Sequence, residues 1–416
     1  MITKSNVIKE NEFLYKDKNL LTILIATTLR GYNLGFMGVF LGVYFYFIGL
    51  SDLKFGIALS CVTLSGALSN LFVYFFKNII SRKQFLIIMS VSSVIGGFIF
   101  LITENYYLIL LASLLSISSI TGGDRTGITS VEIPIISKLV ELKKQTSAYS
   151  VYNFLPMISK IIGTSILLIV PILTSVTELK TKTVYSILLT IYIVITILQT
   201  LVYNFLDHRI EAKEKVQKKI SKIKNNESSL IIIITFLFAI DSFGGGFIAR
   251  SFITFWLIKK FSLSEATLSI IFIIAQVLNG LSLVIAPKIA KNIGVLNTMI
   301  LSQMIANGII IVAALSSNWI LATVLYLIKE TFNDLDIPTR QAFMMSIVKE
   351  NNQTQMASMS NLGRTAAHTF SPGIAGYISS VLGISLSLVF GSTIKLLYSL
   401  ILLRFKFSTF NKLEIK

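Results

Sequence analysis

The chain has very few of the side chains that most enzymes and secreted domains rely on. Its 416 residues include one cysteine, Cys61, and two histidines, His208 and His368. One cysteine excludes an internal disulfide framework and a thiolate metal cluster, and two histidines are too few for a histidine-based metal site. The sequence also lacks a Gly-x-x-x-x-Gly-Lys-Ser/Thr phosphate loop, a Gly-x-Ser-x-Gly motif and a His-Glu-x-x-His motif. We therefore expect no enzyme activity, no metal, no cofactor and no direct use of ATP.

Charged residues are scarce as well. They make up 14% of the chain, while 54% of its residues are hydrophobic, and a soluble domain carries about 25% charged residues. Twelve segments are apolar over roughly 20 residues or more, which is enough to cross about 30 Å of hydrocarbon. The predicted spans are residues 20–48, 55–77, 84–103, 105–133, 146–173, 184–206, 229–258, 265–287, 295–315, 319–347, 354–380 and 383–404. The predicted fold class is an all-α membrane protein of twelve transmembrane helices.

The net charge of +17 first suggests a nucleic-acid partner. With the N-terminus inside the cell, however, 24 of the 37 Lys and Arg residues fall on the cytosolic side of the predicted helices, 5 on the outer side and 8 within helices. This distribution follows the positive-inside rule. The charge therefore predicts a multi-pass protein of the plasma membrane, with both termini cytosolic, the lipid bilayer as its partner and no nucleic acid.

The sequence divides into two similar halves. Leu50-Ser-Asp52 after the first span resembles Leu263-Ser-Glu265 after the seventh, and Ser150-Val-Tyr-Asn153 resembles Ser358-Met-Ser-Asn361. We expect a six-helix half at 1–206, a cytosolic linker at 207–228 and a second six-helix half at 229–416. Parallel repeats of this kind are a known transporter plan, with a binding site between the halves.

Ionisable side chains gather in the predicted tenth span, at Lys329, Glu330, Asp334, Asp336 and Arg340. Each costs about 2.5–3.5 kcal/mol at the centre of a membrane helix, so such residues face a watery cavity or pair with one another. Helical spacing places Lys329, Asp336 and Arg340 on one face, and Glu330 and Asp334 on an adjacent one. Two carboxylates this close in a low dielectric do not both ionise readily, so one of them can carry a proton. Pro338 has no N–H and predicts a kink beside this pair. The alternative is that these charges only neutralise one another as a structural network.

Several other predicted spans also carry charged residues, whereas the spans 84–103, 184–206 and 295–315 carry none. Arg30 and Asp241 lie at similar depths in the first and seventh spans, which makes them a candidate pair between the halves. Lys395 in the last span has no evident role. The further candidates for solute binding or coupling are Asn33, Asp124, Arg125 and Arg364.

Two motifs carry a resemblance to a known family. They are Ala239-Ile-Asp241-Ser-Phe-Gly-Gly-Gly-Phe247 and Asp336-Ile-Pro-Thr-Arg-Gln341. The chain resembles the major facilitator superfamily, and in particular a prokaryotic subgroup that has these motifs and no assigned substrate. The resemblance covers nearly the whole chain and implies that helices 1, 4, 7 and 10 line a cavity.

The superfamily signature between helices 2 and 3 is partly present, with Arg82 and Lys83 at its conformational positions. Asn78 stands where the signature has Asp, which puts the usual ion-pair latch in doubt. The helix 5 antiporter motif is missing.

From these features we predict a secondary transporter of a small solute that works by alternating access, is coupled to the proton gradient and functions as a monomer. Glu330, Asp334, Asp336 and Asp241 are the candidate proton carriers, and Arg30, Arg125, Arg340 and Arg364 would bind an anionic group or act on those acids. The alternatives are an uncoupled facilitator and a transporter-like receptor or scaffold that moves no solute.

Overall fold

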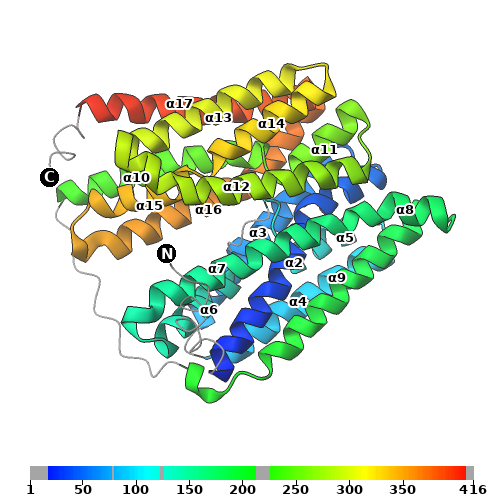
Figure 1. The fold of residues 1–416 in the computed structure, drawn as a ribbon, viewed down its shortest axis with the longest axis horizontal. Helices are drawn as coiled ribbons and strands as arrows, with labels where there is room; N and C mark the ends of the chain where they lie inside the picture. Colours follow the sequence, from blue (N-terminus) through cyan, green and yellow to red (C-terminus); the bar gives the residue numbers. More distant parts are fainter. Residues whose placement is uncertain (1–16, 77–78, 122–125, 212–224, 409–416) are drawn as a thin grey trace, which may run out of the picture. The chain divides into compact units, whose positions relative to one another are not determined.

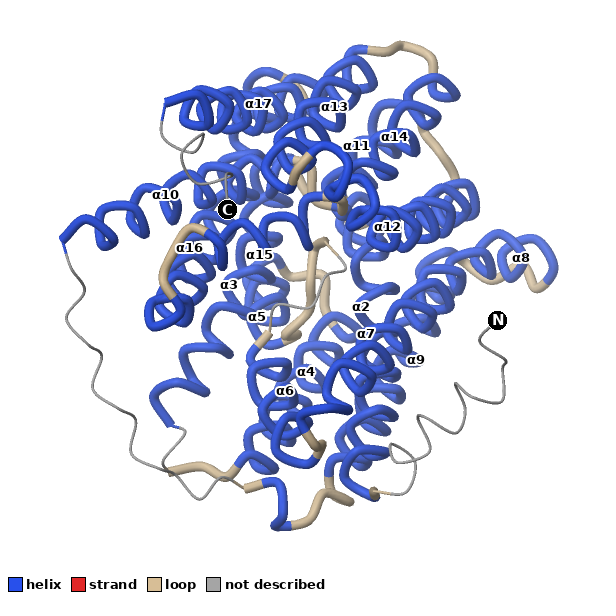
Figure 2. Tube along the Cα trace, turned by 60° about the vertical axis from the view of Figure 1, so that its left-hand side comes forward, coloured by secondary structure: helices blue, strands red, loops and turns tan. Residues whose placement is uncertain are grey.

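Helices make up all the regular secondary structure of residues 17–76, 79–121, 126–211 and 225–408, which are the residues that the computed structural model describes (Figure 2). In chain order they are α2 (Lys18–Phe47), α3 (Asp52–Phe76), α4 (Arg82–Ile102), α5 (Tyr106–Leu115), α6 (Gly127–Leu139), α7 (Leu142–Ser165), η1 (Ile166–Leu168), α8 (Ile169–Val176), α9 (Thr181–Tyr203), η2 (His208–Ile210), α10 (Asn225–Phe247), α11 (Arg250–Phe261), α12 (Glu265–Ile293), α13 (Val295–Leu315), α14 (Trp319–Asn333), α15 (Asp336–Ser346), α16 (Glu350–Leu382) and α17 (Ile384–Ser408). The predicted all-α class is confirmed.

In the described part of the chain, nine helical segments are long and apolar enough to cross a membrane. The other three predicted spans are also helical, but each has a specific difference. The span 105–133 is interrupted between α5 and α6, and the span 319–347 between α14 and α15. Helix α16 is continuous over 33 residues but carries many Ser, Asn and Gln side chains, so its composition is more polar than that of the others.

Local sequence signals account for where several helices begin and end. Ser81 and Gln84 form a capping box at the start of α4, and the Asn318 side chain accepts hydrogen bonds from the first turn of α14. Such caps satisfy backbone N–H groups that a helix leaves unpaired. Gly294 and Gly383 have positive φ angles of 88° and 89°, which glycine adopts without steric cost, and they join α12 to α13 and α16 to α17.

The chain divides into two units. Unit 1 contains the N-terminal helix up to Tyr44 and the chain from Cys61 to the linker. Unit 2 contains the chain after the linker together with Phe45–Ser60. Within unit 2, α10 packs along α16 and α13 packs along α17, and within unit 1, α4 packs along α9 (Figure 1).

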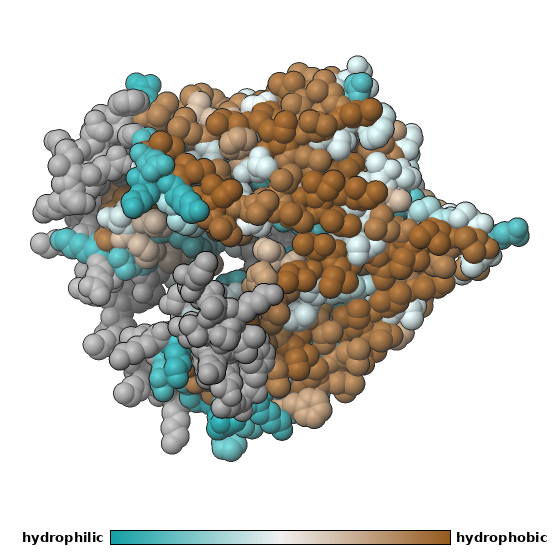
Figure 3. Space-filling model, in the orientation of Figure 1, coloured by the Kyte–Doolittle hydropathy of each residue, from teal (hydrophilic) through white to brown (hydrophobic). Residues whose placement is uncertain are grey.

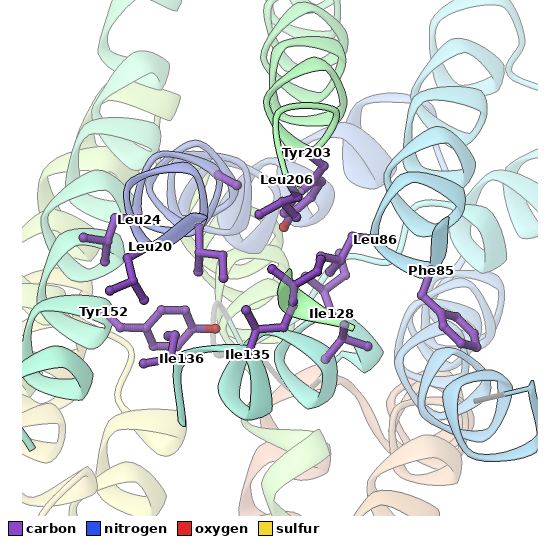
Figure 4. Packing of buried hydrophobic residues seen from close by; sticks show 14 of the residues in the cluster. Leu20, Leu24, Phe85, Leu86, Ile128, Ile135, Ile136, Tyr152, Tyr203 and Leu206 are labelled. Carbon is purple, nitrogen blue, oxygen red and sulfur yellow. The ribbon is translucent and has the colours of Figure 1, made fainter. Parts of the chain in front are cut away.

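Each unit has its own apolar core. In unit 1 the core joins Leu20 and Leu24 of α2, Leu86 of α4, Ile135 of α6 and Tyr203 of α9 (Figure 4). In unit 2 it joins residues of α10, α13, α15 and α17, which include Phe238, Met299, Phe343 and Tyr398. Many large apolar side chains remain exposed, and on the face that Figure 3 shows they cover the helices while hydrophilic residues gather near helix ends. Such a surface suits a bilayer. Lipid tails solvate apolar side chains, so an apolar helix face need not be buried inside the protein.

Glycines bring α2 close to α7 in unit 1. A Cβ atom at Gly31 would lie 2.7 Å from Pro156 Cα, and one at Gly35 would lie 2.1 Å from the Lys160 carbonyl oxygen. Real Cβ atoms do not approach backbone atoms this closely, so only glycine permits the helix crossing. The N-terminal glycines therefore serve helix packing.

We predict that Gly35→Ala lowers the melting temperature of the purified protein by the equivalent of about 1–3 kcal/mol or more, because the added methyl group forces α2 and α7 apart. The matched control is Gly308→Ala in α13, where a Cβ would meet nothing within 4 Å. The control should be neutral or slightly stabilising, since Ala favours helix more than Gly does. Equal melting temperatures for both variants would contradict the packing role of Gly35.

Asp52 at the start of α3 connects Phe45–Ser60 to the rest of unit 2. Its carboxylate accepts hydrogen bonds from Lys259 at the end of α11 and from Ser379 of α16. The Ser60 hydroxyl accepts a hydrogen bond of 2.8 Å from the backbone N–H of Gly373. Phe55 stacks on Phe255 with ring centroids 4.0 Å apart. A segment of the N-terminal half is thus tied to α11 and α16 by polar and aromatic contacts.

We expect Asp52→Ala to destabilise the protein by about 1–3 kcal/mol, since the buried carboxylate is the acceptor for two donors that would then lack it. The control is Glu104→Ala, which removes a pair with Lys182 whose side chains are 48% and 69% exposed. An exposed pair of this kind contributes at most about 1 kcal/mol. The two variants are compared by thermal unfolding in detergent. A larger loss of stability for Glu104→Ala than for Asp52→Ala would show that the Asp52 contacts are unimportant.

Candidate functional site

Each unit contains a group of buried charged side chains that neutralise one another. The unit 1 cluster consists of Thr27 and Arg30 (α2), Glu132 (α6), Tyr152 (α7) and Tyr203 (α9). The unit 2 cluster consists of Asp241 (α10), Asp336 and Arg340 (α15) and Lys395 (α17). In both clusters the charged side chains are at most 7% exposed, so their charges must be compensated within the protein.

In the unit 1 cluster, donors surround the carboxylate of Glu132. Arg30 Nη2 lies 2.6 Å from Glu132 Oε2, Tyr152 donates to the same oxygen at 2.7 Å, and Tyr203 donates to Oε1 at 2.7 Å. The Arg30 guanidinium also donates to the Tyr203 hydroxyl at 3.1 Å and to Thr27 Oγ1 at 3.1 Å. Figure 4 shows Tyr152 and Tyr203 extending from different helices into the unit 1 core. The cluster therefore joins four helices of unit 1.

In the unit 2 cluster, Asp241 is held by two bases. Arg340 Nη1 lies 3.0 Å from Asp241 Oδ2, and Lys395 Nζ lies 2.5 Å from Oδ1. Arg340 Nη2 also pairs with Asp336 at 3.0 Å, and Arg364 of α16 lies near enough for its charge to act on Asp241. The arrangement resembles that of unit 1 with the charges exchanged. In unit 1, α2 supplies the base and α6 the acid, whereas in unit 2, α10 supplies an acid and α15 a base.

The candidate pair of Arg30 and Asp241 between the halves stays a prediction. Inside its own unit, each of the two residues has a short ion pair with another partner. Similar depth in two helices is a weak guide, because it says nothing of the rotation of each helix about its axis. The role of Lys395, unexplained by the sequence, follows from its pairing with Asp241.

The tenth span is kinked at Asp334 and Leu335, where the backbone stays in the right-handed helical region. Helix α14 ends at Asn333 and α15 begins at Asp336. The carbonyl of Asp334 accepts a hydrogen bond of 3.2 Å from the Ile337 N–H. Pro338 falls in the first turn of α15, where a missing N–H is tolerated. The kink that Pro338 predicts is therefore present at the expected place.

The two acids of this span, Glu330 and Asp334, differ in their partners. Glu330 pairs with Lys329 at 2.7 Å, and its charge also acts on Asp334, as expected for two acids one helical turn apart. Asp334 accepts a hydrogen bond of 2.8 Å from Asn333 Nδ2 and, among the residues that the structure describes, has no ion-pair partner. Asp334 is half-buried at the helix break.

Arg82 and Lys83 hold the beginning of the linker against unit 1. The carboxylate of Glu211 accepts hydrogen bonds from the backbone N–H groups of both residues, at 2.8 and 3.3 Å. The Arg82 side chain donates to the Ile210 carbonyl, and Lys83 Nζ donates to those of Asn204 and Leu206.

Asn19 and Asp207 lie nearby, and the Asn19 side-chain amide donates a hydrogen bond of 2.9 Å to the Asp207 carboxylate. This hydrogen bond is the main reason that the pKa of Asp207 is lowered to about 2. The chain leaving α9 is therefore fixed to the starts of α2 and α4.

The remaining predicted site residues have mixed outcomes. Asn33 donates a hydrogen bond of 3.0 Å to Thr196 of α9, so it joins two helices of unit 1. Asp124 and Arg125 lie outside the described residues. Glu132 was not among the predicted site residues, and its pairing with Arg30 could have been suspected only from the repeat that relates helices 1 and 4 to helices 7 and 10.

Comparisons with known proteins agree with this architecture. A model of the family described as "MFS/sugar transport protein" matches residues 115–403. An uncharacterised membrane protein of Saccharomyces cerevisiae is 18% identical to this chain over 401 residues, which is 89% of this chain and 90% of the yeast protein.

Several solved structures share the fold. The nucleoside transporter NupG superimposes with a TM-score of 0.71 at 13% identity, covering 92% of this chain and 98% of NupG. A D-xylose–proton symporter has a TM-score of 0.71 at 13% identity, with 93% and 98% covered. A bacterial homologue of the lysosomal transporter Spinster has a TM-score of 0.70 at 14% identity, with 96% and 98% covered. With the family model matching more than half of its length, this chain is a multi-pass membrane protein that belongs to the MFS/sugar transport protein family of the major facilitator superfamily, and it is a transporter and not an enzyme.

Proposed function

We propose that this protein carries a small solute across the plasma membrane by alternating access, with both termini cytosolic, as a monomer coupled to the proton gradient. The observation that carries the coupling proposal is the contrast between Asp334 and the other acids of its surroundings. Glu330, Asp336 and Asp241 each have a short ion pair. Asp334 has a hydrogen bond from Asn333 and no cation partner in the described part of unit 2.

A carboxylate that loads and releases a proton must not be held permanently by a cation. A buried ion pair keeps its carboxylate charged, because removing either charge leaves the other one uncompensated in a low dielectric. Asp334 is free of this restraint and stands half-exposed at the break between α14 and α15. Broken helices are where transporters commonly place their substrate and ion sites.

The charged groups that face Asp334 are Glu330, Asp336 and Lys329. Two of these carry negative charge, so a proton on Asp334 relieves repulsion around it. The fold accommodates such coupling, since one protein of this fold is described as a D-xylose–proton symporter.

We predict that Asp334→Asn abolishes accumulation driven by a pH gradient in proteoliposomes while solute exchange without a gradient continues. The amide keeps the shape of the side chain and cannot release a proton. The solute is first found by thermal-shift screening at two pH values. Glu104→Gln, an exposed acid that pairs with Lys182, should retain both activities. Full gradient-driven accumulation by Asp334→Asn would exclude this residue as the carrier, and accumulation that ignores pH in the unmodified protein would indicate an uncoupled facilitator.

Alternating access also requires each six-helix half to move as a body. We propose that the unit 1 cluster supports this motion by joining α2, α6, α7 and α9, and that it does not contact the solute. Its side chains are satisfied within the cluster, and Glu132 is fully buried.

Glu132→Leu alone is therefore expected to destabilise the protein by about 3–5 kcal/mol, because it leaves the Arg30 charge buried without its partner. The double variant Arg30→Met, Glu132→Leu should recover most of the lost melting temperature, since apolar residues of similar volume often replace a buried ion pair at little cost. It should also transport solute. A double variant that is stable but inactive would show that the pair contacts the solute or takes part in coupling.

A further inference from the structure

Three successive glycines, Gly244, Gly245 and Gly246, lie near the end of α10. Helix α10 packs along both α16 and α17. A Cβ atom at Gly244 would lie 2.7 Å from the carbonyl oxygen of Gly391 in α17, and one at Gly246 would lie 2.9 Å from Cβ of Ser371 in α16. Two of the three glycines therefore serve close helix packing.

Gly245, the middle one, serves no such contact. Apart from the backbone of its own helix, a Cβ atom here would meet nothing in the described structure within 4 Å. Residues three or four positions away on a helix share its face. All four of these neighbours are at most 8% exposed, and they are Asp241, Ser242, Ile248 and Ala249. An open position among buried neighbours is a hollow in the protein and not a lipid-facing surface, and we call it the Gly245 hollow.

Gly308 in α13 shows the contrast. A Cβ atom at Gly308 would also meet nothing in the described structure within 4 Å. Two of its neighbours on the same helix face, however, are large and apolar, with Ile305 43% exposed and Val312 55% exposed. Such a face suits contact with lipid tails. The two glycines therefore have room for a side chain in different surroundings, and Gly308 is a matched control for Gly245.

A buried hydroxyl without a partner lies beside the Gly245 hollow. Ser242 is 4% exposed, and its Oγ atom has no hydrogen-bond partner in the described structure. Side chains on a helix lean toward its N-terminus, so the space at Gly245 extends over the turn that carries Ser242. A buried hydroxyl that stays unpaired is unfavourable, which makes Ser242 a candidate to bind a polar group that enters this space.

The charges near Ser242 favour an uncharged partner. The carboxylate of Asp241 is already held by Arg340 at 3.0 Å and by Lys395 at 2.5 Å, and Arg364 also acts on it through its charge. A cation would find this carboxylate occupied, and an anion would have to draw a base away from it. Breaking a buried ion pair is strongly unfavourable. A hydroxyl or amide group can hydrogen-bond to Ser242 without disturbing these pairs.

We propose that Ser242 and Gly245 form a contact site for the transported solute. An uncharged hydroxyl or amide group of the solute enters the Gly245 hollow and hydrogen-bonds to Ser242, and the absence of a side chain at Gly245 sets the size of the group that is admitted. This inference rests on the proposed transport function and names the part of the solute that α10 binds.

The test places a thiol in the Gly245 hollow. The single native cysteine is removed as Cys61→Ser, and Gly245→Cys and the control Gly308→Cys are purified as full-length proteins in detergent. Each reacts with methanethiosulfonate reagents that carry a methyl, a hydroxyethyl, an anionic sulfonatoethyl or a cationic trimethylammonioethyl group, and each rate is divided by that reagent's rate with free mercaptoethanol. The hydroxyethyl reagent should react about 10-fold faster or more at Gly245→Cys than at Gly308→Cys, because a thiol on an apolar face stays protonated and only the thiolate reacts.

The role of the hydroxyl is tested in the Gly245→Cys protein. Ser242→Ala should lower the rate of the hydroxyethyl reagent relative to the methyl reagent by about 2- to 10-fold, since one hydrogen bond between neutral groups is lost. Ser360→Ala in α16 also removes a buried hydroxyl without a partner and should leave this ratio unchanged. Melting temperatures before labelling show that each variant is folded. Similar rates at Gly245→Cys and Gly308→Cys, faster reaction with the charged reagents than with the hydroxyethyl reagent, or an equal effect of Ser360→Ala would overturn the proposal.

Uptake by proteoliposomes separates this site from the proposed function. Gly245→Leu should stop uptake of the solute found by thermal-shift screening, because its side chain fills the hollow, whereas Gly308→Leu should leave uptake unchanged. Uptake retained by Gly245→Leu would refute the solute contact and leave the transport function standing. Labelling that follows the expected pattern in a protein that moves no solute would uphold the site and refute transport.

Discussion

Compensation of buried charge is the constraint on which the rest of this structure depends. A bilayer offers no water to an ionised side chain, so each charge on a transmembrane helix must find a partner of opposite sign on another helix or remain near a polar opening. Arg30 with Glu132, and Asp241 with Arg340 and Lys395, meet this demand by joining helices that are distant in the sequence. Helix packing in lipid gains little from the hydrophobic effect. These ion pairs, with the glycine contact of α2 and α7, therefore specify which helices are neighbours in each unit.

Two charged residues of unit 2 differ from these paired charges. Asp334 and Arg250 each stand at a helix break in unit 2, and in the described structure neither is held by an ion pair. Breaking a helix exposes backbone groups that a continuous helix would satisfy internally, and membrane proteins tolerate this only where the backbone meets protein or a polar cavity. In unit 2, the turn between α10 and α11 and the turn between α14 and α15 each have a charged side chain beside them. Unit 1 holds its buried charges in a closed network of hydrogen bonds.

Much of this could be predicted from the sequence, and the reasons for the failures are physical. Hydropathy and the distribution of Lys and Arg predicted the helices and the membrane, because the thickness of the bilayer imposes one length on every span. Pro338 predicted the disruption of the tenth span, since the missing N–H acts locally. Partners across helices could not be predicted. Whether Arg30 meets Asp241 or Glu132 depends on how each helix is rotated and tilted, and whether Glu330 pairs with Lys329 depends on the side-chain rotamers of both residues.

The Asp52 contacts show that the boundary between repeats in the sequence is not the boundary between packed units. Phe45–Ser60 is encoded in the first repeat and belongs to the second unit, where Asp52, Ser60 and Phe55 meet α11 and α16. A gene split at the linker would thus produce a C-terminal fragment that lacks part of its own packing surface. Such a fragment would complete this packing surface only when the N-terminal half is also present to supply Phe45–Ser60.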